Sequence, residues 1–108
     1  MYELVIDAAD HLAVTTWWAG LLGGEVKHDD EDDFSWIEGI PEMPFELVFQ
    51  EVPEPKTVKN RIHWDLWGST SDALAAGATL VRARDNEIDW DVLADPEGNE
   101  FCVFERGQ

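Results

Sequence analysis

The sequence predicts an α+β fold built from two similar modules. Apolar and polar residues alternate in several short segments, which is the pattern of half-buried strands. Each half also holds one helical segment between such strands, and the order strand, helix and three strands occurs twice. With 108 residues, the chain has the length of one domain. We therefore expect a single domain, residues 1–108, with module one at about 1–52, a crossover at 53–59 and module two at about 60–108.

The first module is predicted to open with a strand over residues 2–8, where apolar and polar residues alternate. Asp10 then has the side chain of a typical helix N-cap. The next apolar residues recur at the spacing of a helix that packs on a sheet, which are Val14, Trp17, Trp18, Leu21 and Leu22. Gly23 and Gly24 are expected to end this helix.

Three more strands complete the first module. Two are predicted at 25–29 and 34–38, joined by the acidic run 29–33. We interpret this run as the solvent-exposed tip of a hairpin. The last strand is expected over 45–52, with residues of odd number facing one way and residues of even number facing the other.

The second module repeats this order with a shorter helix. A strand is predicted over 61–67, followed by a helix over about 71–76 that Gly77 ends. Three further strands are expected, at 79–85, 88–94 and 100–105. The turn DPEGN separates the last two strands, because its proline and glycine favour a tight turn.

The composition excludes several classes of partner. The chain holds 24 acidic residues against 7 lysines and arginines, a formal net charge of −17. Such a surface repels nucleic acids and anionic membranes, so we expect neither as a partner. No apolar run approaches the roughly 20 residues of a membrane span, the start does not resemble a signal peptide, and the single cysteine allows no internal disulfide. We expect a cytoplasmic protein whose acidity serves solubility, or alternatively favours a cationic or neutral ligand.

Two segments resemble a known family. DPEGNEFCVF at 95–104 and NRIHWDL at 60–66 are similar to the glyoxalase/bleomycin-resistance, or vicinal oxygen chelate, superfamily, and in particular to small glyoxalase-like proteins of actinobacteria. The resemblance covers nearly the whole chain. It implies two βαβββ modules that form cupped sheets around a cleft, with the helices outside. It also implies a homodimer, because short chains of this superfamily often pair.

The same resemblance implies where a metal would bind. Classical members hold a divalent ion with four side chains, and those positions fall on Glu3, Glu46, His63 and Cys102. Strand alternation independently predicts that Glu46, His63 and Cys102 face away from the helices. A cysteine in the last position disfavours ions that prefer oxygen ligands and suits Zn²⁺ better. We therefore expect no catalytic metal, with Zn²⁺, Ni²⁺ or Mn²⁺ as alternatives.

The expected ligand-binding face combines apolar side chains with a few polar groups, as small-molecule pockets do. Six tryptophans are more than a core of this size usually takes, so some are expected to line this face. Its predicted members are Val5, Trp36, Val48, Gln50, Arg61, His63, Asp65, Trp67, Trp90, Cys102 and Phe104. We expect Arg61 to form an ion pair with Asp65 or Glu46; the alternative is that it anchors a ligand carboxylate or carbonyl.

The sequence thus predicts a protein that binds a small molecule in a tryptophan-rich cleft without a catalytic metal. One alternative is a metal-dependent lyase or isomerase that resembles glyoxalase I, with Glu46 and His63 as candidate catalytic residues. Another alternative is a resistance protein that sequesters a drug of the bleomycin type. Whether the chain is an enzyme is left open by the sequence.

Overall fold

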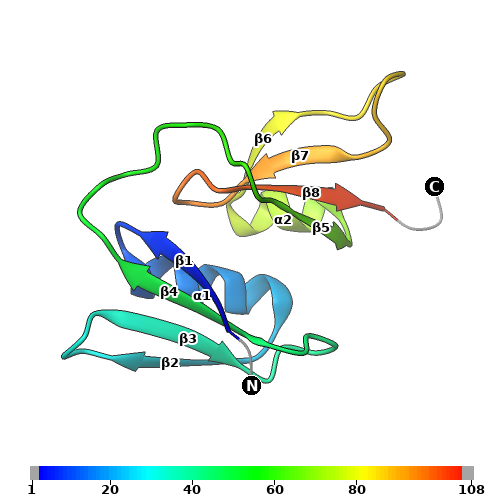
Figure 1. The fold of residues 1–108 in the computed structure, drawn as a ribbon. Helices are drawn as coiled ribbons and strands as arrows, with labels where there is room; N and C mark the ends of the chain where they lie inside the picture. Colours follow the sequence, from blue (N-terminus) through cyan, green and yellow to red (C-terminus); the bar gives the residue numbers. More distant parts are fainter. Residues whose placement is uncertain (1–2, 106–108) are drawn as a thin grey trace. The chain divides into compact units, whose positions relative to one another are not determined.

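The structure, a computed structural model, describes residues 3–105 and consists of two compact units, Met1–Pro55 and Lys56–Gln108. Each unit contains one helix and a four-stranded mixed sheet (Figure 1). The order strand, helix and three strands occurs in both, so the predicted α+β fold of two βαβββ modules is confirmed. Neither helix in the described part of the chain has the length and apolar character that crossing a bilayer demands.

The first unit contains β1 (Glu3–Ala8), α1 (His11–Leu22), β2 (Glu25–Asp29), β3 (Phe34–Glu38) and β4 (Glu46–Glu51). The strands lie in the order β1-β4-β3-β2. β1 pairs with β4 in parallel, and the other neighbours are antiparallel. Strand β4 is shorter by one residue at each end than the 45–52 predicted.

The limits of α1 follow from its flanking residues, as predicted. Asp10 caps the helix by accepting a hydrogen bond from the Ala13 N–H at 3.2 Å. At the other end Gly23 adopts a φ of 88°, and its N–H donates to the Ala19 carbonyl at 2.8 Å. Gly24 follows with a φ of 101°, which lets the chain turn directly into β2.

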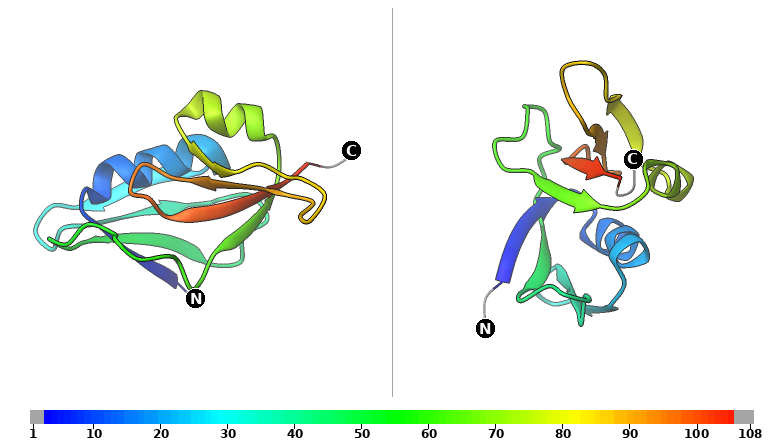
Figure 2. Two further views of the ribbon diagram at one scale, coloured as in Figure 1. Left: turned by 90° about the horizontal axis from the view of Figure 1, so that it is seen from above. Right: turned by 90° about the vertical axis from the view of Figure 1, so that its right-hand side faces the viewer.

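The core of the first unit lies between α1 and the sheet. The helix packs mainly against β3 and β4, on one side of the sheet (Figure 2, right). The large side chains buried there are Val14, Trp18, Ile37, Leu47 and Phe49. Only part of the predicted helical stripe is fully buried: Trp17, Leu21 and Leu22 are half-buried, and two polar residues that were not predicted, His11 and Thr15, are buried instead.

The second unit contains β5 (Trp64–Trp67), α2 (Thr70–Ala76), β6 (Thr79–Arg82), β7 (Asp91–Ala94) and β8 (Glu100–Phe104). Its strand order, β5-β8-β7-β6, repeats that of the first unit, and β5 again pairs in parallel with β8. Helix α2 begins after its N-cap Ser69 and ends at Gly77, close to the predicted limits. It packs less closely on its sheet than α1 does.

Strand β5 begins three residues later than predicted. The side chain of Asn60 accepts a hydrogen bond from the Glu100 N–H at 3.3 Å, so the pairing of β5 with β8 starts only at Trp64 and Phe101. Ile62, expected to pack with Trp64 and Leu66, is 81% exposed. The predicted strand at 61–63 is therefore wrong, because the Glu100 N–H bonds to the Asn60 side chain instead of to the backbone of a neighbouring strand.

Strands β6 and β7 are also shorter than expected, because Asp85 forms a turn between them. Its carboxylate accepts from the N–H groups of Glu87 at 2.7 Å and Ile88 at 3.1 Å. These two hydrogen bonds, together with an ion pair to Arg82, hold the pKa of Asp85 below its ordinary value. The predicted strands therefore lose residues 83–85 and 88–90.

A buried carboxylate, Asp91, ties α2 to the sheet. It accepts hydrogen bonds from the Thr70 hydroxyl at 2.5 Å and from the Arg84 N–H at 2.7 Å. Burial alone would raise the pKa of Asp91, but these two bonds and the charge of Arg84 outweigh it and bring the pKa below its ordinary value. The start of the short helix is thus fixed by a polar contact.

Candidate functional site

In the first unit, the contacts of Ser35 show which sheet face is free of the helix. The Ser35 hydroxyl donates to the His11 carbonyl on α1 at 3.1 Å, so Ser35 points toward the helix. Because side chains alternate along a strand, Trp36 points the other way, and the register brings the partners of Trp36 to the same face. The predicted site residues of this unit all lie on that open face: Glu3, Val5, Trp36, Glu46, Val48 and Gln50.

The open face of the first unit has an apolar centre. Val5, Val48 and Trp36 lie side by side on three adjacent strands. The Trp36 ring stacks on Phe34 at a centroid distance of 5.4 Å, and its Nε1–H donates to Glu38 at 2.8 Å. This hydrogen bond and the stacking fix the orientation of the indole. The face can therefore offer a flat apolar surface to a ligand.

In the second unit, the Thr70 contact identifies the helix side in the same way. Asp91 bonds to Thr70 on α2 and lies opposite Val103 of β8, so both point toward the helix. Cys102 and Phe104 then point to the open face, together with Asp65 and Trp67, which pair with them in register. The predicted facing is thus the one observed for these four residues, whereas Arg61, His63 and Trp90 lie outside the strands.

Three aromatic rings form a continuous surface on this open face, which we call the aromatic shelf (Trp67, Phe104 and Trp90). The Phe104 ring lies between the two indoles, 5.6 Å from Trp67 and 5.3 Å from Trp90. Trp67 is 63% exposed, although tryptophan usually buries most of its surface. An exposed indole beside two other rings is the type of surface on which flat ligands stack.

A hollow of about 430 Å³ adjoins the aromatic shelf. It is lined by Trp67 and Phe104 together with Arg84, Asp89 and Glu105. Arg84 is bound to Glu105 at 3.1 Å, so most of its charge is compensated. The volume falls within the range of about 300–1,000 Å³ that is typical of small-molecule pockets.

The three charged residues of this hollow were not among the predicted site residues. Arg84 and Asp89 lie in the connection between β6 and β7, and Glu105 follows the last strand. Strand alternation does not apply to such positions, so the sequence pattern held no signal for them. A second hollow, lined by Asp65, Leu66, Trp67 and Phe104, continues along the shelf.

Beside the shelf lie three polar side chains, which we call the polar trio (His63, Asp65 and Cys102). The imidazole Nδ1 of His63 is 3.9 Å from the Cys102 sulfur and 4.0 Å from an Asp65 carboxylate oxygen. All three potential ligand atoms lie within 4.8 Å of one another. His63 and Asp65 are exposed, whereas Cys102 is buried in β8.

The environment of Cys102 favours a neutral thiol. Burial raises the pKa of this thiol, and the negative charge of Asp65, its hydrogen bond to Asp65 and the charge of Glu100 raise it further. Lys59 opposes these effects only weakly. Since the thiolate is the nucleophilic form of cysteine, the arrangement disfavours covalent catalysis by Cys102.

The positions implied for a metal fall into two groups. Glu3 and Glu46 lie opposite each other on β1 and β4 in the first unit. His63 and Cys102 approach each other in the second unit, where Asp65 joins them. Within residues 3–105, the trio is the one group of three or more His, Cys, Asp or Glu side chains found close enough to hold an ion. A donor set with a thiol does not fit ions that prefer six oxygen ligands.

The structure does not contain one of the two ion pairs expected of Arg61, the pair with Asp65. The Arg61 side chain is exposed, and no ion pair joins it to Asp65 among the described residues of the second unit. The pair with Glu46, which belongs to the first unit, stays a prediction. The strand that would have directed Arg61 toward Asp65 does not extend to position 61. The alternative, a contact with a ligand carboxylate or carbonyl, stays a prediction.

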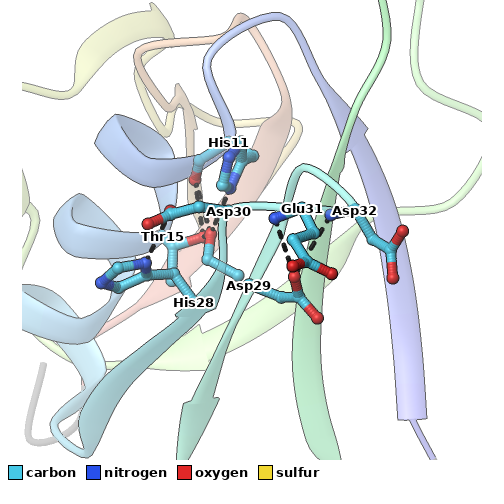
Figure 3. Close-up of polar contacts among 8 residues, drawn as sticks. His11, Thr15, His28, Asp29, Asp30, Glu31 and Asp32 are labelled. Atoms are coloured by element: carbon cyan, nitrogen blue, oxygen red, sulfur yellow. Dashed lines mark hydrogen bonds and ion pairs between the residues drawn. The ribbon is translucent and has the colours of Figure 1, made fainter.

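The sequence also gave no indication of a buried polar cluster beneath α1 (Figure 3). The Ser35 hydroxyl lies 2.8 Å from His11 Nδ1 and 2.7 Å from the Thr15 hydroxyl. The Thr15 hydroxyl in turn donates to the His11 carbonyl at 2.7 Å. Thr15 and Ser35 are fully buried, so a ligand cannot reach this cluster and its role is structural.

The acidic tip has the local structure expected of a hairpin. Asp29 accepts hydrogen bonds from the Glu31 N–H at 2.9 Å and the Asp32 N–H at 3.2 Å (Figure 3). His28 pairs with Asp30 at 2.8 Å on the exposed surface. The tip therefore shapes a turn by its own side chains.

Solved structures with the same fold cover almost the whole chain. A glyoxalase/bleomycin resistance protein/dioxygenase family enzyme from Burkholderia phytofirmans matches with a TM-score of 0.70 and 19% identity over 95% of each chain. A fosfomycin resistance protein from Mesorhizobium loti matches with a TM-score of 0.68 and 9% identity over 96% of this chain and 89% of its own. The trypanothione-dependent glyoxalase I of Leishmania major matches with a TM-score of 0.62 and 15% identity over 97% of this chain and 85% of its own. At these identities the likeness concerns the fold.

No curated protein matches the chain in sequence. The model of the glyoxalase-like domain, in contrast, matches residues 3–104, which is nearly the whole chain. The topology of the two modules agrees with this match, since both repeat the same strand order. The chain therefore belongs to the glyoxalase-like domain family.

Proposed function

We propose that this glyoxalase-like protein binds a small molecule on the open face of its second unit, and that this binding requires no catalytic metal. The observation that carries the proposal is the exposed indole of Trp67, which stands beside Phe104 over a hollow of ligand size. Exposing so much aromatic surface costs free energy, because burial of apolar area yields about 25 cal/mol per Å². A ligand that stacks on the aromatic shelf recovers this cost.

The polar groups around the shelf support the same proposal. Ligand pockets are mostly apolar and use a few placed polar groups to orient the ligand. Here Asp65, Asp89 and Glu105 border the shelf, and Arg84 is already paired with Glu105. The shelf would thus bind a flat molecule that carries hydrogen-bond donors.

Titration calorimetry with a panel of flat aromatic compounds, in the presence of a chelator, tests the proposal. Removing the exposed indole with Trp67→Ala is expected to weaken binding about tenfold, since stacking on one aromatic side chain is worth about 1 kcal/mol or more. The matched control is Leu12→Ala, which truncates an exposed apolar residue of α1 in the first unit. Equal affinities for Trp67→Ala and the unchanged protein would refute the proposal.

A metal-dependent lyase or isomerase is the second candidate, favoured by the polar trio alone. In this alternative Glu46 or His63 would move the proton, and the metal would polarise a carbonyl group. The thiol of Cys102 weighs against the ions with oxygen ligands that such chemistry commonly uses. Activity that appears only after adding Ni²⁺ or Mn²⁺ would favour this candidate over metal-free binding.

We also propose that the protein is a homodimer. Apolar side chains on α2 and β6 of the second unit are exposed, namely Leu74, Leu80 and Val81. A partner chain that covers them would remove this apolar surface from water. Sedimentation equilibrium at several protein concentrations measures the mass directly, and a monomer mass throughout would contradict the proposal.

A further inference from the structure

We infer that the ligand of the second unit carries two flat groups joined by a short linker, and that it places one group on each side of Trp67. The inference rests on the proposed binding at the aromatic shelf and adds the shape of the ligand to it. It starts from the second hollow, which shares Trp67 and Phe104 with the first. Binding of a single flat group would satisfy the proposed function but not this inference.

The two hollows differ in the rest of their lining. We call the hollow of about 430 Å³ the inner hollow and the second one, of about 320 Å³, the edge hollow. Apart from the two shared rings, the inner hollow is lined by the β6–β7 connection and the residue after β8, whereas the edge hollow is lined by β5. Both volumes lie in the lower half of the range of about 300–1,000 Å³ typical of ligand pockets. Each hollow is therefore suited to one small ring system.

The strand order explains why Trp67 stands between the hollows. Strand β5 is an edge strand of the sheet β5-β8-β7-β6, with no paired strand on its outer side within the described part of the second unit (Figure 1). Trp67 is the last residue of β5 and lies opposite Phe104 on β8. The β6–β7 connection can reach these two rings only from the side of β7. The edge hollow lies toward the free edge of β5, where Leu66 also lines it.

The indole of Trp67 has enough exposed surface for two contacts. Its residue is 63% exposed even though the Phe104 ring lies only 5.6 Å away. The two ring planes meet at 57°, so Phe104 is tilted against the indole and does not stack flat on it. A ligand group in one hollow alone would leave the part of the indole that borders the other hollow in water. A second flat group removes that apolar surface from water as well.

Each hollow offers a hydrogen-bond acceptor to its own flat group. Asp89 lines the inner hollow, beside the ion pair of Arg84 with Glu105. Asp65 lines the edge hollow, and its side chain is 62% exposed. A carboxylate has two acceptor oxygens, so each can accept from a donor on the ligand. The charged pair makes the inner hollow the place for the more polar of the two flat groups.

Titration calorimetry on the full-length protein compares a probe with one ring system and probes with two. The first is 2-naphthol, and the others are bis-naphthols in which two naphthol units are joined by two to six methylene groups. We expect two molecules of 2-naphthol per chain, but one molecule of bis-naphthol. The bis-naphthol of the best linker length should bind about 100-fold more tightly than 2-naphthol, because its second ring binds intramolecularly.

Variants in each hollow separate the two positions. Asp89→Asn should weaken one of the two 2-naphthol sites about tenfold, and Asp65→Asn should weaken the other by a similar factor, because each removes a charged acceptor. Trp67→Ala should weaken both sites. Leu12→Ala, in the first unit, is the control and should leave both unchanged. Circular dichroism checks that Trp67→Ala folds, and the exposed Asp65 and Asp89 variants decide the matter if it does not.

Several results would overturn the inference. One 2-naphthol per chain, with no gain from linking two rings, would do so while leaving the proposed function intact. Two sites with no gain at any linker length would mean that separate ligands fill the hollows. Equal weakening of one and the same site by Asp65→Asn and Asp89→Asn would show a single undivided hollow. No binding of either probe would count against the proposed function and would remove this inference with it.

Discussion

Gly24, at the joint between α1 and β2, offers a quantitative test of the fold. In a Gly24→Ala variant the new Cβ would lie 2.7 Å from Ile37 Cγ2 and 2.8 Å from the carbonyl oxygen of Glu38. The second contact is with backbone, in the residue that pairs with Glu25 at the end of the β2–β3 ladder. The carbonyl cannot move without disturbing this ladder, so the clash must be absorbed by the chain itself.

The expected cost has two parts. A φ of 101° is one that residues with a Cβ rarely adopt, and such strain costs about 1–3 kcal/mol. Overpacking against two atoms adds about 1–3 kcal/mol. We therefore expect a loss of about 4 kcal/mol in the free energy of unfolding. Since each kcal/mol shifts the Tm of a domain of this size by about 4–8 °C, the Tm should fall by about 20 °C.

Two other glycines separate these contributions. Gly39 has a φ of 70°, but a Cβ there would meet nothing within 4 Å, so Gly39→Ala should show only the backbone strain. Gly20 lies inside α1 with nothing within 4 Å, and Gly20→Ala should stabilise by about 0.5–1 kcal/mol. Urea unfolding followed by circular dichroism measures all three. If Gly24→Ala costs no more than Gly39→Ala, the contact argument is incorrect.

Three further predictions concern polar groups. Because the folded-state pKa of Asp91 is lowered, its contribution to stability is complete above about pH 4 and is lost as the pH falls through the folded pKa. Asp91→Asn should thus destabilise by about 1–3 kcal/mol near pH 7 and flatten the acid limb of the stability curve, measured by urea unfolding across pH. Ser35→Ala should cost about 1–3 kcal/mol, because it removes the partner of the His11 ring; an unchanged urea midpoint would contradict this. The raised pKa of Cys102 should make its alkylation by iodoacetamide slower in the folded than in the unfolded chain at pH 8, as mass spectrometry can show.

The sheet faces could be predicted from the sequence because strand geometry is local. Side chains alternate with a period of two, so the large apolar residues beside Trp36 or Cys102 settle which way those residues point. The helix caps were predictable for a similar reason, since Asp10 and Gly23 act on neighbouring backbone groups. No information about distant segments was needed for either.

Two of the errors occur where a distant residue decides the local structure, whereas the short β6 and β7 follow from Asp85, whose hydrogen bonds to Glu87 and Ile88 are local. Asn60 binds the backbone of Glu100, forty positions away, and thereby shortens β5 and leaves Arg61 outside the strand. Likewise Ser35 draws His11 into the core through a contact across twenty-four positions. Such hydrogen bonds depend on the tertiary arrangement, and no local sequence pattern predicts them.

Both units pair their first strand with their last, β1 with β4 and β5 with β8. This topology determines the order in which the strands can pair while the chain is synthesised on the ribosome. Helix α1 and the hairpin of β2 and β3 can form early, but β1 has no neighbour until β4 has left the exit tunnel. A nascent chain that has emerged from the tunnel only as far as residues 38–46 would therefore hold Leu4 and Ile6 unpaired, and at this stage the N-terminal strand is exposed to chaperones and to aggregation.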